Sequence, residues 1–219
     1  LDAPLTALEA ATGKTIETYE GTRAAEEVVY RDGVLFVLAN TAAEKPDYDG
    51  RLRFAKGYGE KFWDEAPRQL LAVRAEGGQV LWKRESRVLP GTLAADAERV
   101  VFHDGRSVVC LDRHTGEPRW RSEPVGRGEE IRSFYLPTLV LYEKVVLFSG
   151  GETAALQTGS WYTSGEDTLT ALSAETGEVL WTAYHPPSGY RSPEDLLVAD
   201  GLVWSGETTS GRAVGVFTG

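Results

Sequence analysis

The sequence has almost no cysteine and no methionine. Cys110 is the single cysteine, which excludes an internal disulfide framework and a zinc site built from several cysteines. The complete absence of methionine extends to the initiator position, so we expect a processed chain or a piece of a longer one.

Long apolar runs and excess positive charge are also lacking. No apolar stretch approaches the roughly 18 residues of a transmembrane helix, and Leu1–Pro4 lacks the basic and apolar regions of a signal peptide. The 23 Lys and Arg residues against 33 Asp and Glu residues give a net charge of −10. This balance argues against a nucleic-acid surface and against binding to an anionic membrane. The sequence has no nucleophile-elbow, phosphate-loop, zinc-protease or EF-hand motif.

Glycine and aromatic residues are plentiful. The chain has 24 Gly, 6 Trp and 9 Tyr, a composition that favours many short strands joined by tight turns. We expect no amphipathic helix, because the helix-forming stretches are interrupted by glycine or proline.

A short motif recurs at residues 5–17, 70–82, 108–120 and 169–181. Each copy predicts a strand, a tight turn at a glycine and a returning strand that ends on tryptophan. A small residue ten positions before the tryptophan is expected to leave room for a ring from a neighbouring unit. The turn glycines are Gly13, Gly78, Gly116 and Gly177, the tryptophans are Trp82, Trp120 and Trp181, and the small residues are Ala7, Ala72, Cys110 and Ala171. The first copy has Glu17 in the tryptophan position.

The spacing of the turn glycines predicts four-stranded units with two insertions. The separations are 65, 38 and 61 residues, and the shortest is close to the roughly 40–45 residues of a WD40-like propeller blade. The longer ones imply insertions at about 41–68 and 150–168, which are polar and rich in turn residues. A second hairpin is predicted in each unit, at residues 28–37, 100–109, 139–148 and 196–204.

The pattern of small residue, aspartate, threonine, glycine and tryptophan resembles the tryptophan-docking motif of the pyrroloquinoline-quinone (PQQ)-like β-propeller family. Residues 169–181 match it with Ser173 in the aspartate position, and residues 108–120 match it with Cys110 in the alanine position. Residues 70–82 depart from it at Arg74 and Gly77. In that family the tryptophan packs between adjacent blades.

The resemblance implies an all-β fold of four-stranded antiparallel blades. We expect residues 1–219 to belong to a single propeller domain and to supply about three to four blades of a seven- or eight-bladed propeller. The remaining blades would lie in the same longer chain or in a partner chain, because an open arc would leave unpaired strand edges. A periplasmic or cell-envelope location follows from the resemblance alone.

Two groups carry this repeat: quinoprotein dehydrogenases, and cofactor-free propellers that include the lipoprotein of the outer-membrane barrel-assembly machinery. The dehydrogenases need PQQ, a calcium ion held by carboxylate and amide oxygens, and often a vicinal disulfide. Cys110 is alone and Asn40 is the only asparagine, so we assign no catalytic, cofactor or metal residue.

Binding candidates lie in the segments that break the repeat, where arginine and aromatic residues typical of recognition surfaces gather. They are Arg51, Arg53 and Trp63 in the first insertion, Trp161 and Tyr162 in the second, and His185 and Arg191 in a proline-rich connection. His103 and His114 are expected to be solvated turn residues.

Two functions remain open. The first is a noncatalytic propeller that binds a protein or an envelope ligand through its face loops, without nucleic acid or a transmembrane segment. The alternative is a PQQ- and calcium-dependent oxidoreductase whose active site lies partly outside this segment.

Overall fold

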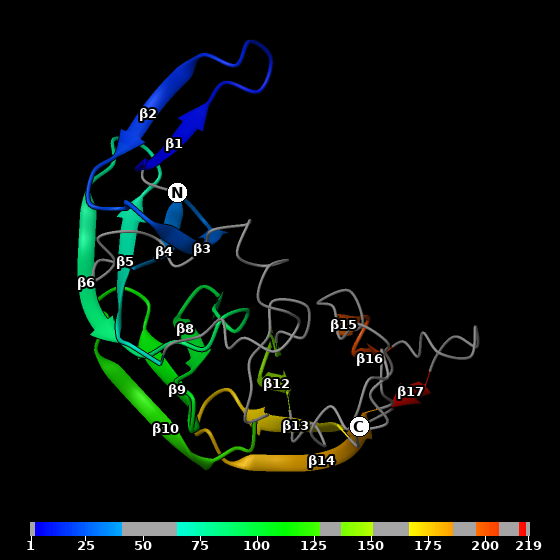
Figure 1. The fold of residues 1–219 in the computed structure, drawn as a ribbon. Coiled ribbons are helices and arrows are strands. Elements are labelled where there is room, and N and C mark those ends of the chain that lie inside the picture. The colour runs from blue at the N-terminus through cyan, green and yellow to red at the C-terminus, as the bar shows by residue number, and fades with distance from the viewer. Residues whose placement is uncertain are drawn as a thin grey trace, which may run out of the picture.

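The described part of the chain is made of strands alone. The computed structural model describes residues 3–40, 65–127, 137–150, 167–185, 196–205 and 215–217. These residues form 17 β-strands arranged as a series of sheets along an arc (Figure 1). Within these ranges there is no helix long and apolar enough to cross a membrane.

Three sheets have four antiparallel strands each, in sequential order. We call them the second, third and fourth blades. The second blade contains β3 (Ala25–Arg31), β4 (Val34–Ala39), β5 (Arg68–Arg74) and β6 (Val80–Ser86). The third contains β7 (Ala94–Ala95), β8 (Arg99–His103), β9 (Ser107–Asp112) and β10 (Pro118–Pro124). The fourth contains β11 (Thr138–Tyr142), β12 (Val145–Ser149), β13 (Asp167–Ser173) and β14 (Val179–His185).

Smaller sheets flank these three blades, so the described residues form three complete blades and parts of two more. The first blade is the hairpin of β1 (Leu5–Leu8) and β2 (Thr15–Tyr19). The fifth is the sheet of β15 (Leu196–Ala199), β16 (Leu202–Ser205) and β17 (Gly215–Phe217). Ala7 pairs with Glu17 as Ala72 pairs with Trp82, so β1 and β2 correspond to the third and fourth strands of a complete blade.

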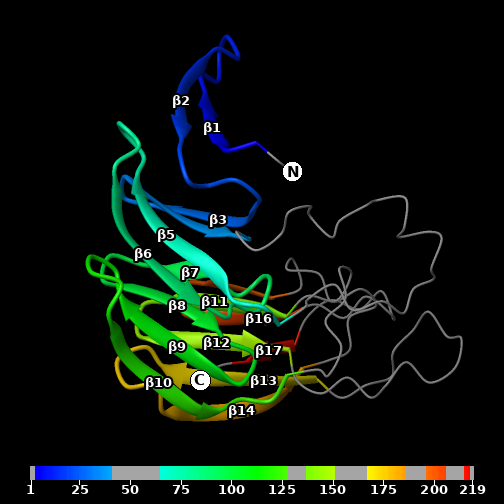
Figure 2. The same cartoon turned by 60° about the vertical axis from the view of Figure 1, so that its left-hand side comes forward.

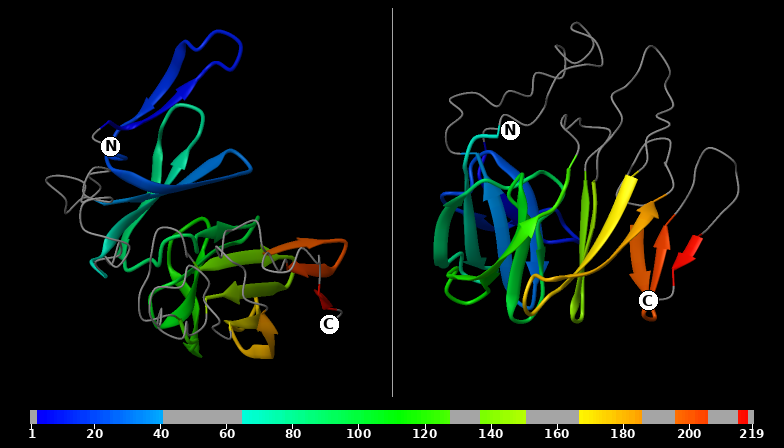
Figure 3. Two further views of the ribbon diagram at one scale, coloured as in Figure 1. Left: turned by 45° about the vertical axis from the view of Figure 1, so that its right-hand side comes forward. Right: turned by 90° about the horizontal axis from the view of Figure 1, so that it is seen from below.

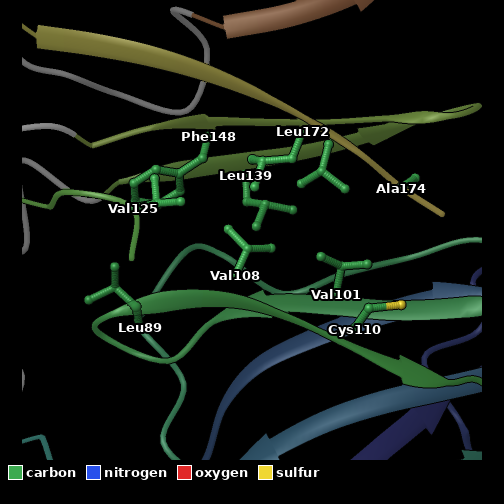
Figure 4. Packing of buried hydrophobic residues seen from close by; sticks show 10 residues of the cluster. Leu89, Val101, Val108, Cys110, Val125, Leu139, Phe148, Leu172 and Ala174 are labelled. Carbon is green, nitrogen blue, oxygen red and sulfur yellow. The ribbon is translucent and has the colours of Figure 1, made fainter. Parts of the chain in front are cut away.

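The core lies between the blades. The apolar run of β4 shows why: Phe36 and Leu38 pack towards the third blade, while Val37 and Ala39 pack towards the first. Because strand side chains alternate between faces, a strand buried on both faces needs an uninterrupted apolar sequence. Figure 4 shows the corresponding layer between the third and fourth blades, where Cys110 and Phe148 are buried.

Strand order places β3, β7, β11 and β15 on the inside of the arc and β6, β10 and β14 on its outside (Figure 1). The inner strands of successive blades contact one another. Short turns join the first strand to the second and the third to the fourth at one end of each blade. We call this end the turn face, and the tips of the β5–β6 and β9–β10 hairpins lie on the left in Figure 2. We call the opposite end, where second strands lead to third strands and each blade leads to the next, the loop face.

The insertions interrupt the same connection in two blades. They fall between β4 and β5 and between β12 and β13, whereas the third blade joins β8 to β9 through Asp104–Arg106. This difference accounts for the short 38-residue repeat. The sequence predicted equivalent hairpins at residues 28–37 and 100–109, and this equivalence was wrong. The turn at Asp104-Gly105 joins the second and third strands and lies on the loop face, whereas the turn at Asp32-Gly33 joins the first and second strands and lies on the turn face. Both connections use the same tight-turn residues, so the sequence does not distinguish them.

Contacts between blades and the candidate binding face

Trp82, on the outer strand β6, contacts the next blade. Its indole Nε1 donates a hydrogen bond of 2.7 Å to the Arg113 carbonyl, and the residue is 8% exposed. A Cβ atom on Gly116 would lie 2.7 Å from Cε3 of the ring. Gly116 has φ +73°, which confirms the positive φ expected for this turn. Glycine is required here both by the backbone conformation and by the ring against it.

Trp120 makes the same contacts one blade further on. Its Nε1 donates to the Ala174 carbonyl at 2.9 Å, three residues before Gly177. A Cβ atom on Gly177 would lie 2.5 Å from Cε3 of Trp120, and this glycine also has positive φ, +76°. The repeated sequence motif therefore corresponds to a repeated contact geometry.

Tyr19 takes over this contact between the first and second blades. Its hydroxyl donates to the Ala75 carbonyl at 2.7 Å, again three residues before the turn glycine, Gly78. Glu17 occupies the tryptophan position in register, but the buried ring comes from the residue two positions later. Tyr19 was not predicted from the sequence, although residues two apart on a strand share a face and this spacing was the available signal.

The small residues of the motif lie opposite the tryptophan of their own blade. Ala72 pairs with Trp82, Cys110 with Trp120 and Ala171 with Trp181. Directly opposed residues in an antiparallel pair share a face, so each small residue has a large ring of its own blade beside it. Rings of the next blade belong to the same buried clusters, Phe102 with Ala72 and Phe148 with Cys110, and the expectation that the small residues make room for such a ring stays a prediction.

The aspartate position of the motif stabilises the turn. The Asp112 carboxylate accepts hydrogen bonds from the backbone amides of His114 and Thr115 at 2.9 and 3.0 Å. The Arg119 guanidinium donates a further hydrogen bond of 2.7 Å to this carboxylate. This bond is the main reason why the pKa of Asp112 is lowered to about 2. The Ser173 hydroxyl accepts longer bonds from the equivalent amides in the fourth blade.

Arg113 joins the second and third blades on the turn face. The residue is 5% exposed, and its guanidinium donates to the Arg31 carbonyl at 2.7 Å and to the Asp96 carbonyl at 2.5 Å. Its Cζ lies 5.5 Å from the centroid of the Phe36 ring. The equivalent residues in the other copies are alanines, so this side-chain link is specific to one pair of blades.

Glu27 joins the same two blades near the inner strands. Its carboxylate accepts hydrogen bonds of 3.1 Å from the backbone amides of Gly91 and Leu93, which precede β7. Burial raises the pKa of Glu27 to about 7, although these two bonds act in the opposite direction. The neighbouring Glu26 is paired with the buried Arg68 at 2.7 Å.

His103 is buried, contrary to the expectation of a solvated turn residue. It ends β8 with no exposed surface, and its ring stacks on Phe148 with centroids 4.5 Å apart. The Gly105 amide donates to Nδ1, so Nε2 carries the proton and donates to the Val125 carbonyl. Burial lowers the pKa of His103 to about 4. His114, on the turn face, is exposed as expected.

The binding candidates lie outside the described residues, apart from the backbone of His185 at the end of β14. These candidates are Arg51, Arg53, Trp63, Trp161, Tyr162 and Arg191. The structure does describe where their segments connect to the blades. The flanking strands β4, β5, β12, β13, β14 and β15 all meet these segments at the loop face, which is uppermost in the right-hand view of Figure 3.

A calcium site of the dehydrogenase type needs several oxygen ligands close together. Within the described ranges, no group of three or more His, Cys, Asp or Glu side chains is placed to hold a metal ion. Cys110 is buried, and burial raises the pKa of its thiol to about 12.

Comparison with known families gives a match over most of the chain. Residues 66–219 match the family model described as outer membrane protein assembly factor BamB. No curated protein matches the chain significantly.

Solved structures share the fold at low sequence identity. BamB from Moraxella catarrhalis is 16% identical with a TM-score of 0.57, and the match covers 98% of this chain and 62% of that one. The computationally designed Ika4 protein is 17% identical with a TM-score of 0.52, covering 92% and 95%. Quinohemoprotein alcohol dehydrogenase ADHIIG from Pseudomonas putida HK5 is 15% identical with a TM-score of 0.51, covering 97% and 39%. The chain thus spans about three fifths of the length of the BamB chain it matches.

Proposed function

Because the chain belongs to the PQQ-like β-propeller family described as outer membrane protein assembly factor BamB, we propose that it is a noncatalytic binding module of the cell envelope. Its partner is a protein or envelope ligand engaged in outer-membrane protein assembly. The remaining blades of the propeller, in a longer chain or a partner chain, complete the domain to which residues 1–219 contribute.

The position of the repeat-breaking segments carries this proposal. Both insertions and the proline-rich connection join strands at the loop face, and they contain the arginines and aromatic residues typical of recognition surfaces. Connections supported by a rigid scaffold are the usual location of binding residues. We therefore assign ligand recognition to the loop face, with Arg51, Arg53, Trp63, Trp161, Tyr162, His185 and Arg191 as the candidates.

We assign a structural role to the repeated positions. The hydrogen bonds of Trp82 and Trp120 and the tight approach of their rings to Gly116 and Gly177 support a docking function between blades. By repetition we extend this role to Trp181, and we assign the turn itself to Gly13 and Gly78.

Photo-crosslinking from the two faces tests the binding proposal. A photoreactive amino acid replaces the exposed Glu65 on the loop face or the exposed Glu143 on the turn face of the full-length protein in cells. We expect a discrete crosslinked envelope protein from position 65 and none from position 143. Crosslinks from position 143 alone would contradict the assignment of the loop face.

An oxidation assay separates this function from the dehydrogenase alternative. The full-length protein is incubated with PQQ, calcium and an electron-accepting dye, and alcohol and sugar oxidation are measured. We expect no turnover. Robust turnover that is lost on mutating an Asp or Glu near the propeller axis would overturn the noncatalytic proposal.

A further inference from the structure

The outermost strands differ in how their free edges are protected. An edge strand exposes unpaired backbone amides and carbonyls, and natural proteins commonly protect such edges with charged residues, proline or short length. β2 has five residues and contains Glu17, while β6 contains Lys83, Arg84 and Glu85. β10 begins and ends with proline and contains Arg119, Arg121 and Glu123.

β14 has none of these protections. Its seven residues, Val-Leu-Trp-Thr-Ala-Tyr-His, include no Asp, Glu, Lys, Arg or proline. The strand lies on the outside of the arc (Figure 1), and within the described ranges it pairs with β13 alone. Valine, threonine and aromatic residues favour extended structure, so both the backbone and the composition suit the addition of another strand.

The start of β14 also exposes apolar surface. Val179 and Leu180 are 50% and 52% exposed, and Thr182 is exposed as well. Because successive side chains point to opposite faces, Val179 and Leu180 present apolar surface on both sides of this edge. In β10 the equivalent positions hold Pro118 and Arg119, whereas β6 has Val80 and Leu81, which are 42% and 37% exposed but are followed by the charged Lys83 and Arg84.

Acidic side chains stand beside this apolar surface. Glu175 and Glu178 lie in the turn that precedes β14, and both are exposed. A partner segment with a lysine or arginine at the end that reaches this turn would place opposite charges together, whereas an acidic end would be repelled. Charge thus selects among the extended segments that the backbone edge alone would accept.

We propose that the outer edge of β14 binds an extended segment of another protein by β-strand addition. The segment alternates β-branched or aromatic residues, carries no charge in its centre and has a basic residue at the end beside Glu178. The backbone hydrogen bonds of the bound segment would supply the affinity, and its apolar side chains and terminal basic residue would supply the specificity. This lateral site is separate from the loop face, so it stands independently of the proposed function.

Peptide binding to the full-length protein tests the site. The probe is fluorescein-labelled Lys-Val-Thr-Val-Tyr-Val-Thr-Lys, whose two terminal lysines allow either strand direction, and binding is followed by fluorescence anisotropy. We expect saturable binding that weakens at least tenfold when alternate backbone nitrogens of the peptide are methylated. This modification removes the inter-strand hydrogen bonds but keeps the charge and the side chains.

Variants locate the binding edge. The double variant Leu180→Lys with Thr182→Lys gives β14 two charged side chains. At position 182 the new lysine matches Lys83, which β6 has at the same repeat position. We expect this double variant to bind the peptide at least tenfold more weakly than the wild-type protein. Binding is also measured at 0.5 M salt, which reduces the repulsion between the new lysines and the basic peptide. Leu81→Lys on β6 is the matched control and should leave binding unchanged. Circular dichroism checks that each variant is folded.

Three results would overturn the proposal: no saturable binding by the wild-type protein, equal binding of the methylated peptide, or unchanged binding by the folded double variant. Light scattering adds a further test. A wild-type dimer that becomes a monomer on Leu180→Lys with Thr182→Lys would assign the edge to a second copy of the chain instead.

Discussion

At the scale of single residues, a glycine in the repeated turn meets two separate demands. Gly13 and Gly177 have nearly the same φ, +71° and +76°. Their surroundings differ, because a Cβ atom on Gly13 would meet nothing within 4 Å while one on Gly177 would lie 2.5 Å from the Trp120 ring. The two positions therefore separate backbone strain from the packing of the ring.

We expect Gly177→Ala to destabilise the protein more than Gly13→Ala. Alanine in the left-handed region costs about 1–2 kcal/mol at either site. At Gly177 the displaced ring should add roughly 1–3 kcal/mol, as overpacked sites do. Urea unfolding of the two variants measures the difference, and equal losses would count against a docked Trp120.

The raised pKa of Glu27 gives stability a pH dependence. Between pH 4.5 and about 7 the folded state retains a proton that the unfolded chain has released, so this group makes stability fall as pH rises through that window. His103 acts in the opposite direction between pH 4 and 6.5, because burial lowers its pKa. Only a comparison of variants isolates Glu27.

We expect Glu27→Gln to remove this contribution. The difference in the free energy of unfolding, wild type minus variant, should fall by on the order of 1–3 kcal/mol between pH 4.5 and 7.5. The contribution of His103 cancels in this difference, because His103 titrates equally in both proteins. Chemical denaturation at several pH values measures the difference. A difference that stays flat across this range would contradict a raised pKa for Glu27.

At the scale of elements, the third blade shows what a blade looks like without an insertion. Asp104–Arg106 joins β8 to β9, and Ser107 then begins the third strand. Gln69 occupies the corresponding place in β5, directly after the buried Arg68 that begins the strand. The two blades have matching registers up to this point, so the insertion is an addition to a complete hairpin.

We therefore expect the insertion to be dispensable for folding. Replacing residues 40–67 with Asp-Gly-Arg retains Arg68 and should leave the melting temperature within a few degrees of wild type. Because Glu65 is removed in this variant, the photoreactive residue is placed at Gly126, on the loop face, in both the wild-type protein and the variant. We expect the crosslink to an envelope protein in the wild type and its loss in the variant. A folded deletion variant that still forms this crosslink would exclude the first insertion from the binding site.

The strands of this fold were largely predictable, while the equivalence of some connections was not. Apolar segments on either side of a tight turn identified the hairpins at residues 28–37, 139–148 and 196–204, because local chemistry determines them. The turn is Asp-Gly in the first and third of these hairpins and Glu143-Lys144 in the second. The pairing of residues 100–109 was also correct, but its place in the blade depends on β7, which has only two residues. So short a strand leaves no periodic signal.

Buried polar residues were the least predictable part of the candidate site. His103 precedes Asp104-Gly105, a sequence typical of solvated turns, and its burial results from Phe148 in another blade. Arg113 likewise reaches carbonyls more than 80 residues away in the sequence. Contacts of this kind depend on how blades are placed relative to one another, and a local pattern carries no such information.

At the scale of the whole molecule, neighbouring blades are joined by a short series of equivalent contacts. Tyr19 reaches Ala75, Trp82 reaches Arg113 and Trp120 reaches Ala174. In repeat architectures stability is approximately a sum of terms for each unit and each interface. Each interface also has links of its own: Glu27 and Arg113 between the second and third blades, and the stacking of His103 on Phe148 between the third and fourth.

We expect Trp120→Ala to uncouple the fourth blade from the third. Truncating the ring should cost about 3–5 kcal/mol, because it removes a large apolar contact and leaves a cavity between blades. In native-state hydrogen exchange, amides of β12 and β13 should lose protection while those of β4 and β5 keep it, since the interface at Trp82 is unchanged. Trp82→Ala is the matched variant and should expose β4 and β5 instead. A uniform loss of protection in both variants would mean that the blades unfold as one cooperative unit and that no single interface controls their separation.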